Sequence, residues 1–100
     1  MTSTSPHSET SRGPIRVLLA DDHELVRDGI RARLQKVSEL EVVGEATNGR
    51  EAVRMTRNLK PDVLLMDVSM PIMNGLEAAM EIRKTQPDVA VLILSVYDNP

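Results

Sequence analysis

The stretch that decides the fold is PDVLLMD, residues 61–67. Its four central residues are all apolar, and no polar residue alternates with them. A short, continuously apolar run of this kind is typical of a strand in a parallel sheet that is covered on both faces. Similar apolar segments occur at 15–20, 42–46 and 89–94. We therefore predict four strands, over 15–20, 41–46, 62–67 and 89–94.

The segments between these strands have helical periodicity. Apolar residues recur at helical spacing in 23–37, 49–59 and 75–85, which predicts three amphipathic helices. Asn48 and Asn74 are each followed three residues later by a glutamate, a pattern typical of helix N-termini. Pro61 and Pro87 end the second and third helices. Alternation of strands and helices predicts an α/β fold with right-handed crossovers.

Composition excludes several classes of function. The net charge of −3 does not favour binding of this chain to nucleic acid or to an anionic membrane. Without cysteine the chain has no disulfides or thiolate metal sites, which fits a cytoplasmic protein. No apolar run approaches the roughly 20 residues that span a bilayer, so we expect no membrane segment. Seven of the first 14 residues are Ser or Thr, and we expect 1–14 to be a disordered tail.

Polar residues gather where the predicted strands end. Asp21 and Asp22 follow the first strand, Asp67 ends the third, and Ser95 follows the fourth. Carboxyl ends of parallel strands share one edge of the sheet, where open α/β sheets bind ligands. Clustered carboxylates repel one another, and a hard cation such as Mg²⁺ relieves this repulsion. A carboxylate beside a metal-held phosphoryl group can act as a nucleophile. Asp22 taken alone is more simply a helix cap, but the three aspartates together with Ser95 at one edge favour a site.

Several motifs resemble one family. LADDH (19–23), VRDG (26–29), VGEA (43–46), DVLLMDVSMP (62–71), MNGLEA (73–78) and VLILS (91–95) are similar to receiver domains of NarL/LuxR-type response regulators of two-component systems. The resemblance implies a flavodoxin-like, doubly wound parallel sheet of strand order 2-1-3-4-5, here truncated after the fourth strand. It also implies a receiver domain over 15–100 that is incomplete at its C-terminus.

The resemblance implies specific roles. Asp67 is then the phosphoacceptor, Asp22 a direct ligand of Mg²⁺, Asp21 a ligand through water, and the Ser69 backbone carbonyl a further ligand. Ser95 matches the switch residue that reports phosphorylation. Other positions follow from the same motifs: the loop is shaped by Pro71 and Gly75, and access of water is tuned by Ser69 and Tyr97.

The partners implied are a sensor histidine kinase, possible self-association, and DNA through a helix-turn-helix domain that is absent from these residues. The family's lysine on the fifth strand has no counterpart, because Lys36, Lys60 and Lys84 all lie in or after helices. We therefore expect slow phosphorylation.

Two rival functions remain open. One is a phosphorylation-incompetent, truncated receiver that acts as a binding module. The other is a phosphohydrolase of the haloacid-dehalogenase type, although that signature needs an aspartate where this chain has Ser69. Two further residues have structural interpretations. One histidine does not make a metal site, so we expect His23 to be an exposed residue of a first helical turn. Gly29 lies within a predicted helix, and we expect it to pack closely on the sheet.

Overall fold

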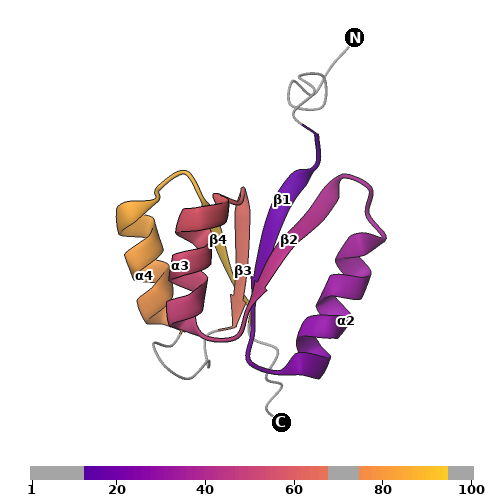
Figure 1. The fold of residues 1–100 in the computed structure, drawn as a ribbon, viewed down its shortest axis with the longest axis horizontal. Coiled ribbons are helices and arrows are strands. Elements are labelled where there is room, and N and C mark those ends of the chain that lie inside the picture. The colour runs from indigo at the N-terminus through magenta and orange to yellow at the C-terminus, as the bar shows by residue number, and fades with distance from the viewer. Residues whose placement is uncertain (1–12, 68–74, 95–100) are drawn as a thin grey trace.

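The computed structural model describes residues 13–67 and 75–94, and these form one parallel sheet with helices on both faces (Figure 1). The strands have the order β2-β1-β3-β4. In chain order the elements are β1 (Ile15–Ala20), α2 (Glu24–Gln35), β2 (Leu40–Ala46), α3 (Gly49–Leu59), β3 (Val63–Asp67), α4 (Gly75–Thr85) and β4 (Ala90–Leu94). The predicted α/β fold is confirmed, and so is the order 2-1-3-4 for the strands described.

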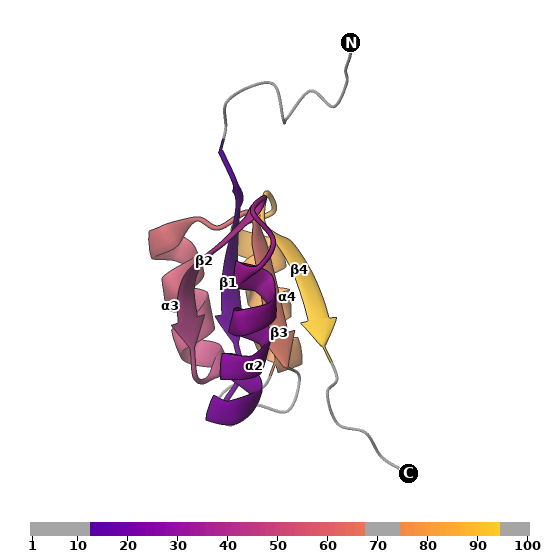
Figure 2. The same cartoon turned by 90° about the vertical axis from the view of Figure 1, so that its right-hand side faces the viewer.

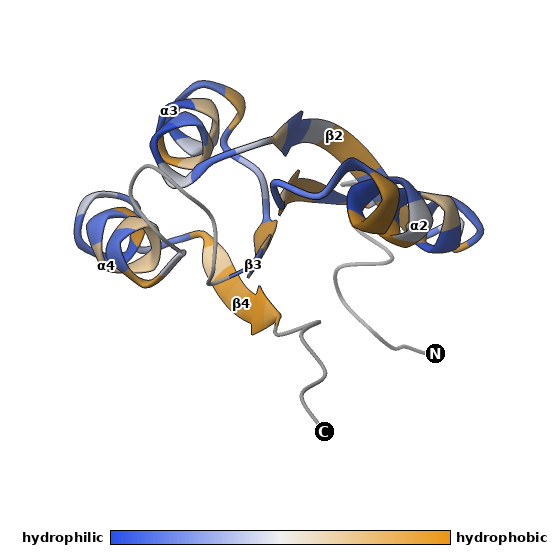
Figure 3. Ribbon diagram, turned by 90° about the horizontal axis from the view of Figure 1, so that it is seen from below, coloured by the Kyte–Doolittle hydropathy of each residue, from blue (hydrophilic) through white to orange (hydrophobic). Residues whose placement is uncertain are grey.

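The helices are distributed unequally over the sheet. α3 and α4 cover one face and α2 covers the other (Figures 1 and 3). The main core lies under α3 and α4, where Leu18 and Leu64 are fully buried. Complete burial of a leucine side chain contributes roughly 1.5–3 kcal/mol. By contrast, α2 has no buried residue.

Caps fix α3 at both ends. The Asn48 side chain accepts a hydrogen bond from the Glu51 backbone N–H at 2.8 Å, which confirms the predicted N-cap. Glu51 in turn accepts from the backbone N–H of Thr47 at 2.7 Å. At the other end, Lys60 has a left-handed backbone with φ 50°. Its N–H donates to the carbonyl of Thr56, and Pro61 then directs the chain into β3.

Some element ends differ from the predicted ones. α2 spans 24–35 rather than 23–37, because the N–H groups of Lys36 and Val37 bond three residues back, to Arg33 and Leu34, in a tightened final turn. β2 begins one residue earlier than predicted, and β3 and β4 begin one residue later. Shifts of this size are ordinary at the ends of elements.

Gly29 and Gly44 differ in the space that surrounds them. A Cβ added at Gly29 would meet no atom within 4 Å, so the expectation of close packing on the sheet was wrong. At Gly44, in β2, an added Cβ would lie 2.9 Å from side-chain atoms of Leu59 and Met55. Gly44 adjoins the point where the pairing of β1 with β2 shifts by one residue. The close packing thus lies in β2 and not in α2.

In the described part of the chain, no helix combines the length and the apolar character needed to cross a membrane. Residues 1–12 of the predicted tail lie outside the described part of the chain.

Candidate functional site

Strand register brings two aspartates to one edge of the sheet. β1 and β3 pair in parallel with Ala20 opposite Met66, so Asp21 and Asp67 follow side by side. Both aspartates are buried, each with 4% of its surface exposed. Burial of a carboxylate is costly unless a charged or hydrogen-bonding partner offsets it. Two buried carboxylates side by side therefore indicate a binding site at this edge of the sheet.

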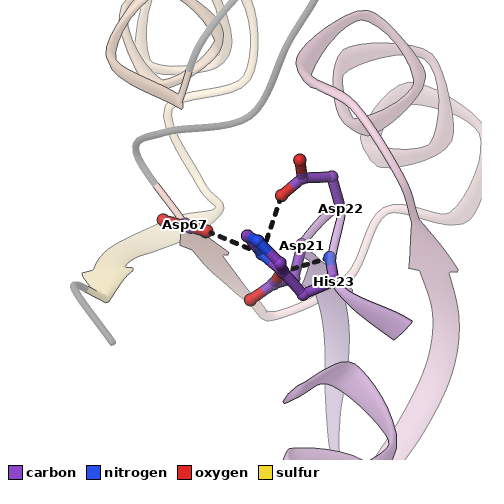
Figure 4. Close-up of side chains that lie close together, drawn as sticks. All are labelled: Asp21, Asp22, His23 and Asp67. Carbon is purple, nitrogen blue, oxygen red and sulfur yellow. Dashed lines mark hydrogen bonds and ion pairs between the residues drawn. The ribbon is translucent and has the colours of Figure 1, made fainter. Parts of the chain in front are cut away.

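Asp22 completes what we call the acidic cluster, which consists of Asp21, Asp22 and Asp67. Each of these residues, together with His23, offers one ligand atom, and all four atoms lie within 4.8 Å of one another (Figure 4). The three predicted aspartates therefore do converge. Asp22 does not cap α2: the N-cap position is His23, and no side chain makes a capping hydrogen bond there.

His23 lies among these acids, a position that the sequence did not predict. Its Nδ1 is 3.1 Å from Asp22 Oδ1, 3.3 Å from Asp21 Oδ1 and 4.0 Å from Asp67 Oδ2 (Figure 4). The side chain is exposed, as expected, with 59% of its surface accessible. Its position beside the acidic pair in the sequence was the only available signal, and one residue of spacing does not reveal which way a side chain turns.

Arg27 links the acidic cluster to β2. One guanidinium nitrogen donates to the Asp21 carbonyl at 2.8 Å, and Nε donates to Glu45 at 2.9 Å. Arg31 donates to the other carboxylate oxygen of Glu45 at 2.7 Å. Partial burial acts to raise the pKa of Glu45, but the hydrogen bonds from Arg31 and Arg27 outweigh it, so the pKa lies below its ordinary value. These bonds hold the end of β1 against its neighbour.

The donor set of the acidic cluster suits a divalent cation. Carboxylate oxygens are the ligands that Mg²⁺ prefers, and three of them at one point carry the negative charge that such an ion neutralises. The three lysines do not neutralise these carboxylates in place of a cation. Lys36 and Lys60 follow the C-termini of α2 and α3, and Lys84 lies in the last turn of α4. Helix C-termini in this fold face the opposite edge of the sheet.

Four further predicted site residues belong to parts of the chain that the structure does not describe. Ser69, Pro71, Ser95 and Tyr97 lie outside the described residues. Gly75 is described, and it is buried at the first position of α4. Ser95 directly follows Leu94, which pairs with Asp67 in the register of β3 and β4. The predicted roles of these residues stay predictions.

Comparison with known proteins gives the family. The protein-family model described as the response regulator receiver domain matches residues 17–100. The chain belongs to the response regulator receiver family. Among solved structures, the signal receiver domain of NarL from Mycobacterium tuberculosis superposes with a TM-score of 0.82 at 36% identity, covering 88% of this chain and 71% of that one.

Curated relatives of this receiver are longer than the chain. The transcriptional regulatory protein LiaR of Bacillus subtilis is 53% identical over 60 residues, which are 60% of this chain and 28% of the relative. The transcriptional regulatory protein DegU of Brevibacillus brevis is 38% identical over 93 residues, which are 93% of this chain and 39% of the relative. The chain thus spans well under half of either protein. The predicted kinship with NarL/LuxR-type response regulators is confirmed.

Proposed function

We propose that this chain is the phosphoacceptor of a two-component system, and that Asp67 receives a phosphoryl group from a sensor histidine kinase. The observation that carries the proposal is the convergence of the buried Asp67 carboxylate with Asp21 and Asp22 at the carboxyl edge of the sheet. Membership of the receiver family supports it. The receiver domain is proposed to cover residues 15–100, beginning with β1.

Three aspartates would hold Mg²⁺ in this proposal. Asp22 and Asp67 are proposed as direct ligands, Asp21 as a ligand through water, and the Ser69 backbone carbonyl as a further ligand. When bound, the ion neutralises the carboxylates and holds phosphoryl oxygens in place. The cytoplasm, which supplies Mg²⁺, is the proposed site of action.

Asp67 is the proposed nucleophile because it ends β3 beside the proposed ion. While one of its carboxylate oxygens is offered to the ion, the other can attack phosphorus. One oxygen of Asp67 forms a bond to phosphorus while the bond from phosphorus to the donor's leaving atom breaks, and the leaving group keeps that electron pair. The product is an acyl phosphate on Asp67. Ser95 is proposed to report this state, Pro71 and Gly75 to shape the loop, and Ser69 and Tyr97 to control access of water.

The output of the whole protein is proposed to be transcriptional control. LiaR and DegU are transcriptional regulatory proteins, and RcsB, 30% identical to this chain, has been solved in complex with DNA. We propose that DNA is contacted by a domain outside these 100 residues.

A methylesterase of Methanococcoides burtonii is 50% identical over 60 residues, but these are only 17% of its length, so we propose a phosphoacceptor rather than an esterase.

Incubation with acetyl phosphate, followed by mass spectrometry of the intact chain, tests this function. We expect one phosphoryl group per chain in the presence of Mg²⁺ and none in the presence of a chelator. Asp67→Asn should abolish labelling and Asp88→Asn, an exposed control, should not. Unchanged labelling of Asp67→Asn would refute the proposal.

A further inference from the structure

Among the four residues that offer ligand atoms at this site, His23 is the one that is not an aspartate. Its Nδ1 faces carboxylate oxygens of Asp21, Asp22 and Asp67 at 3.3, 3.1 and 4.0 Å (Figure 4). The imidazole nitrogen therefore points toward the space that these three carboxylates surround. In a site for Mg²⁺ alone, a water normally occupies the coordination position toward which this nitrogen points. Mg²⁺ keeps several waters as ligands and binds imidazole weakly.

The backbone holds His23 in this position. Its N–H donates to Asp21 Oδ1 at 2.7 Å, which closes a tight turn directly after β1. His23 then occupies the N-cap position of α2 in an extended conformation, with φ −102° and ψ 110°. Its side chain makes no capping hydrogen bond. The imidazole is thus directed by the turn toward the acids and is not engaged by the helix end.

We propose that His23 is a ligand of the cation in the acidic cluster, binding through Nδ1, and that it shifts the cation preference of this receiver toward Co²⁺ and the later first-row transition metals. This inference rests on the proposed cation site. The four ligand atoms lie within 4.8 Å of one another. Opposite ligands of an ion with bonds of about 2.1 Å are separated by roughly 4.2 Å, so small side-chain movements suffice.

The chemistry of the donor set gives the direction of the preference. Oxygen donors suit Mg²⁺, whereas imidazole nitrogen favours transition ions. His23 therefore adds affinity for Co²⁺ and adds little for Mg²⁺. As a half-exposed side chain, it can turn to accept the ion without repacking of the core.

Titration calorimetry with Mg²⁺ and with Co²⁺ tests this inference on the wild type, His23→Ala and His7→Ala, which removes the only other histidine. We expect His23→Ala to weaken Co²⁺ binding roughly tenfold or more and Mg²⁺ binding by less than about threefold. His7→Ala should change neither. Electron spin echo spectra of the Mn²⁺-loaded wild type should contain modulation from a coordinated nitrogen, and His23→Ala should lose it.

Three outcomes overturn the inference: equal weakening of both ions, no weakening of Co²⁺, or tighter binding of both ions by His23→Ala. The last would mean that the imidazole competes with the cation instead of binding it. Asp22→Ala separates this failure from failure of the proposed function. If Asp22→Ala abolishes binding of both ions while His23→Ala has no effect, the cation site stands and only the role of His23 is lost. If Asp22→Ala changes neither, the cation site itself is absent.

Discussion

At the scale of single residues, the acidic cluster depends on charges that are placed against one another. Asp21 and Asp67 are each 4% exposed and lie side by side at the ends of β1 and β3. Arg27 supports this arrangement from outside by holding the Asp21 carbonyl and Glu45 together.

Mg²⁺ should stabilise the fold by binding to the acidic cluster. A ligand that binds only the folded state raises the free energy of unfolding by RT ln(1 + [L]/Kd), or about 2.7 kcal/mol at a concentration of 100 times Kd. Thermal melting with and without Mg²⁺ measures this shift. We expect it to disappear in Asp22→Ala and to persist in Asp88→Ala, whose aspartate precedes β4 at the opposite edge. An unchanged shift in Asp22→Ala would exclude the acidic cluster as the site.

Glu45→Gln should make stability less dependent on pH. Hydrogen bonds from Arg31 and Arg27 hold the pKa of Glu45 below its ordinary value against the effect of partial burial. Glu45 therefore stabilises the fold above its unfolded pKa, and this contribution is lost as pH falls through the folded pKa. We expect Glu45→Gln to cost about 1 kcal/mol at pH 7, since the pair is partly exposed.

Urea denaturation between about pH 7 and pH 3 measures the effect. The difference in stability between wild type and Glu45→Gln should shrink as the solution becomes acidic. Glu41→Gln, which changes an exposed carboxylate of the same strand, should show no such trend. A difference between wild type and Glu45→Gln that stays constant over this range would mean that Glu45 is not the group responsible.

At the scale of elements, the sequence predicted each strand and helix to within two residues, because apolar runs and caps are local signals. Asn48 is one example, since its side chain caps α3 as its spacing from Glu51 indicates. The contacts that the sequence did not predict are those that depend on tertiary geometry. Arg27 meets Glu45 only because α2 lies against β2, and His23 meets Asp67 only because β1 pairs with β3.

Gly29 and Gly44 should respond in opposite ways to alanine. Gly29→Ala places a methyl group in open space on α2 and should raise the free energy of unfolding by about 1 kcal/mol through helix propensity. Gly44→Ala forces apart the side chains of Leu59 and Met55 and should lower it by about 1–3 kcal/mol. Urea denaturation of both variants checks the pair. Stabilisation by Gly44→Ala, or loss of stability in Gly29→Ala, would contradict the packing described.

At the scale of the whole molecule, β4 is the outer strand of the described sheet and is strongly apolar (Figures 2 and 3). Leu92 is 53% exposed and Ile93 is 41% exposed. The second edge is formed by β2, which carries two glutamates, Glu41 and Glu45. Apolar edge strands pair readily with other chains, whereas charged ones resist this. The two edges of the sheet therefore differ in their tendency to associate.

A polypeptide of these 100 residues alone should self-associate through β4. Light scattering over a range of concentrations should show a mass that rises above that of the monomer. Leu92→Lys places a charge on the exposed edge and should shift the equilibrium toward the monomer. Wild-type chains that stay monomeric at every concentration, or a Leu92→Lys variant that associates as strongly, would contradict this prediction.

The central claim is that Asp67 carries the phosphoryl group as an acyl phosphate. Borohydride reduces an acyl phosphate to an alcohol and thereby converts the modified aspartate to homoserine. After incubation with acetyl phosphate and Mg²⁺, reduction and peptide mass mapping, we predict homoserine at position 67 and unmodified aspartate at positions 21 and 22. Homoserine at position 21 or 22, or none at position 67 under conditions that label the intact chain, would contradict the account.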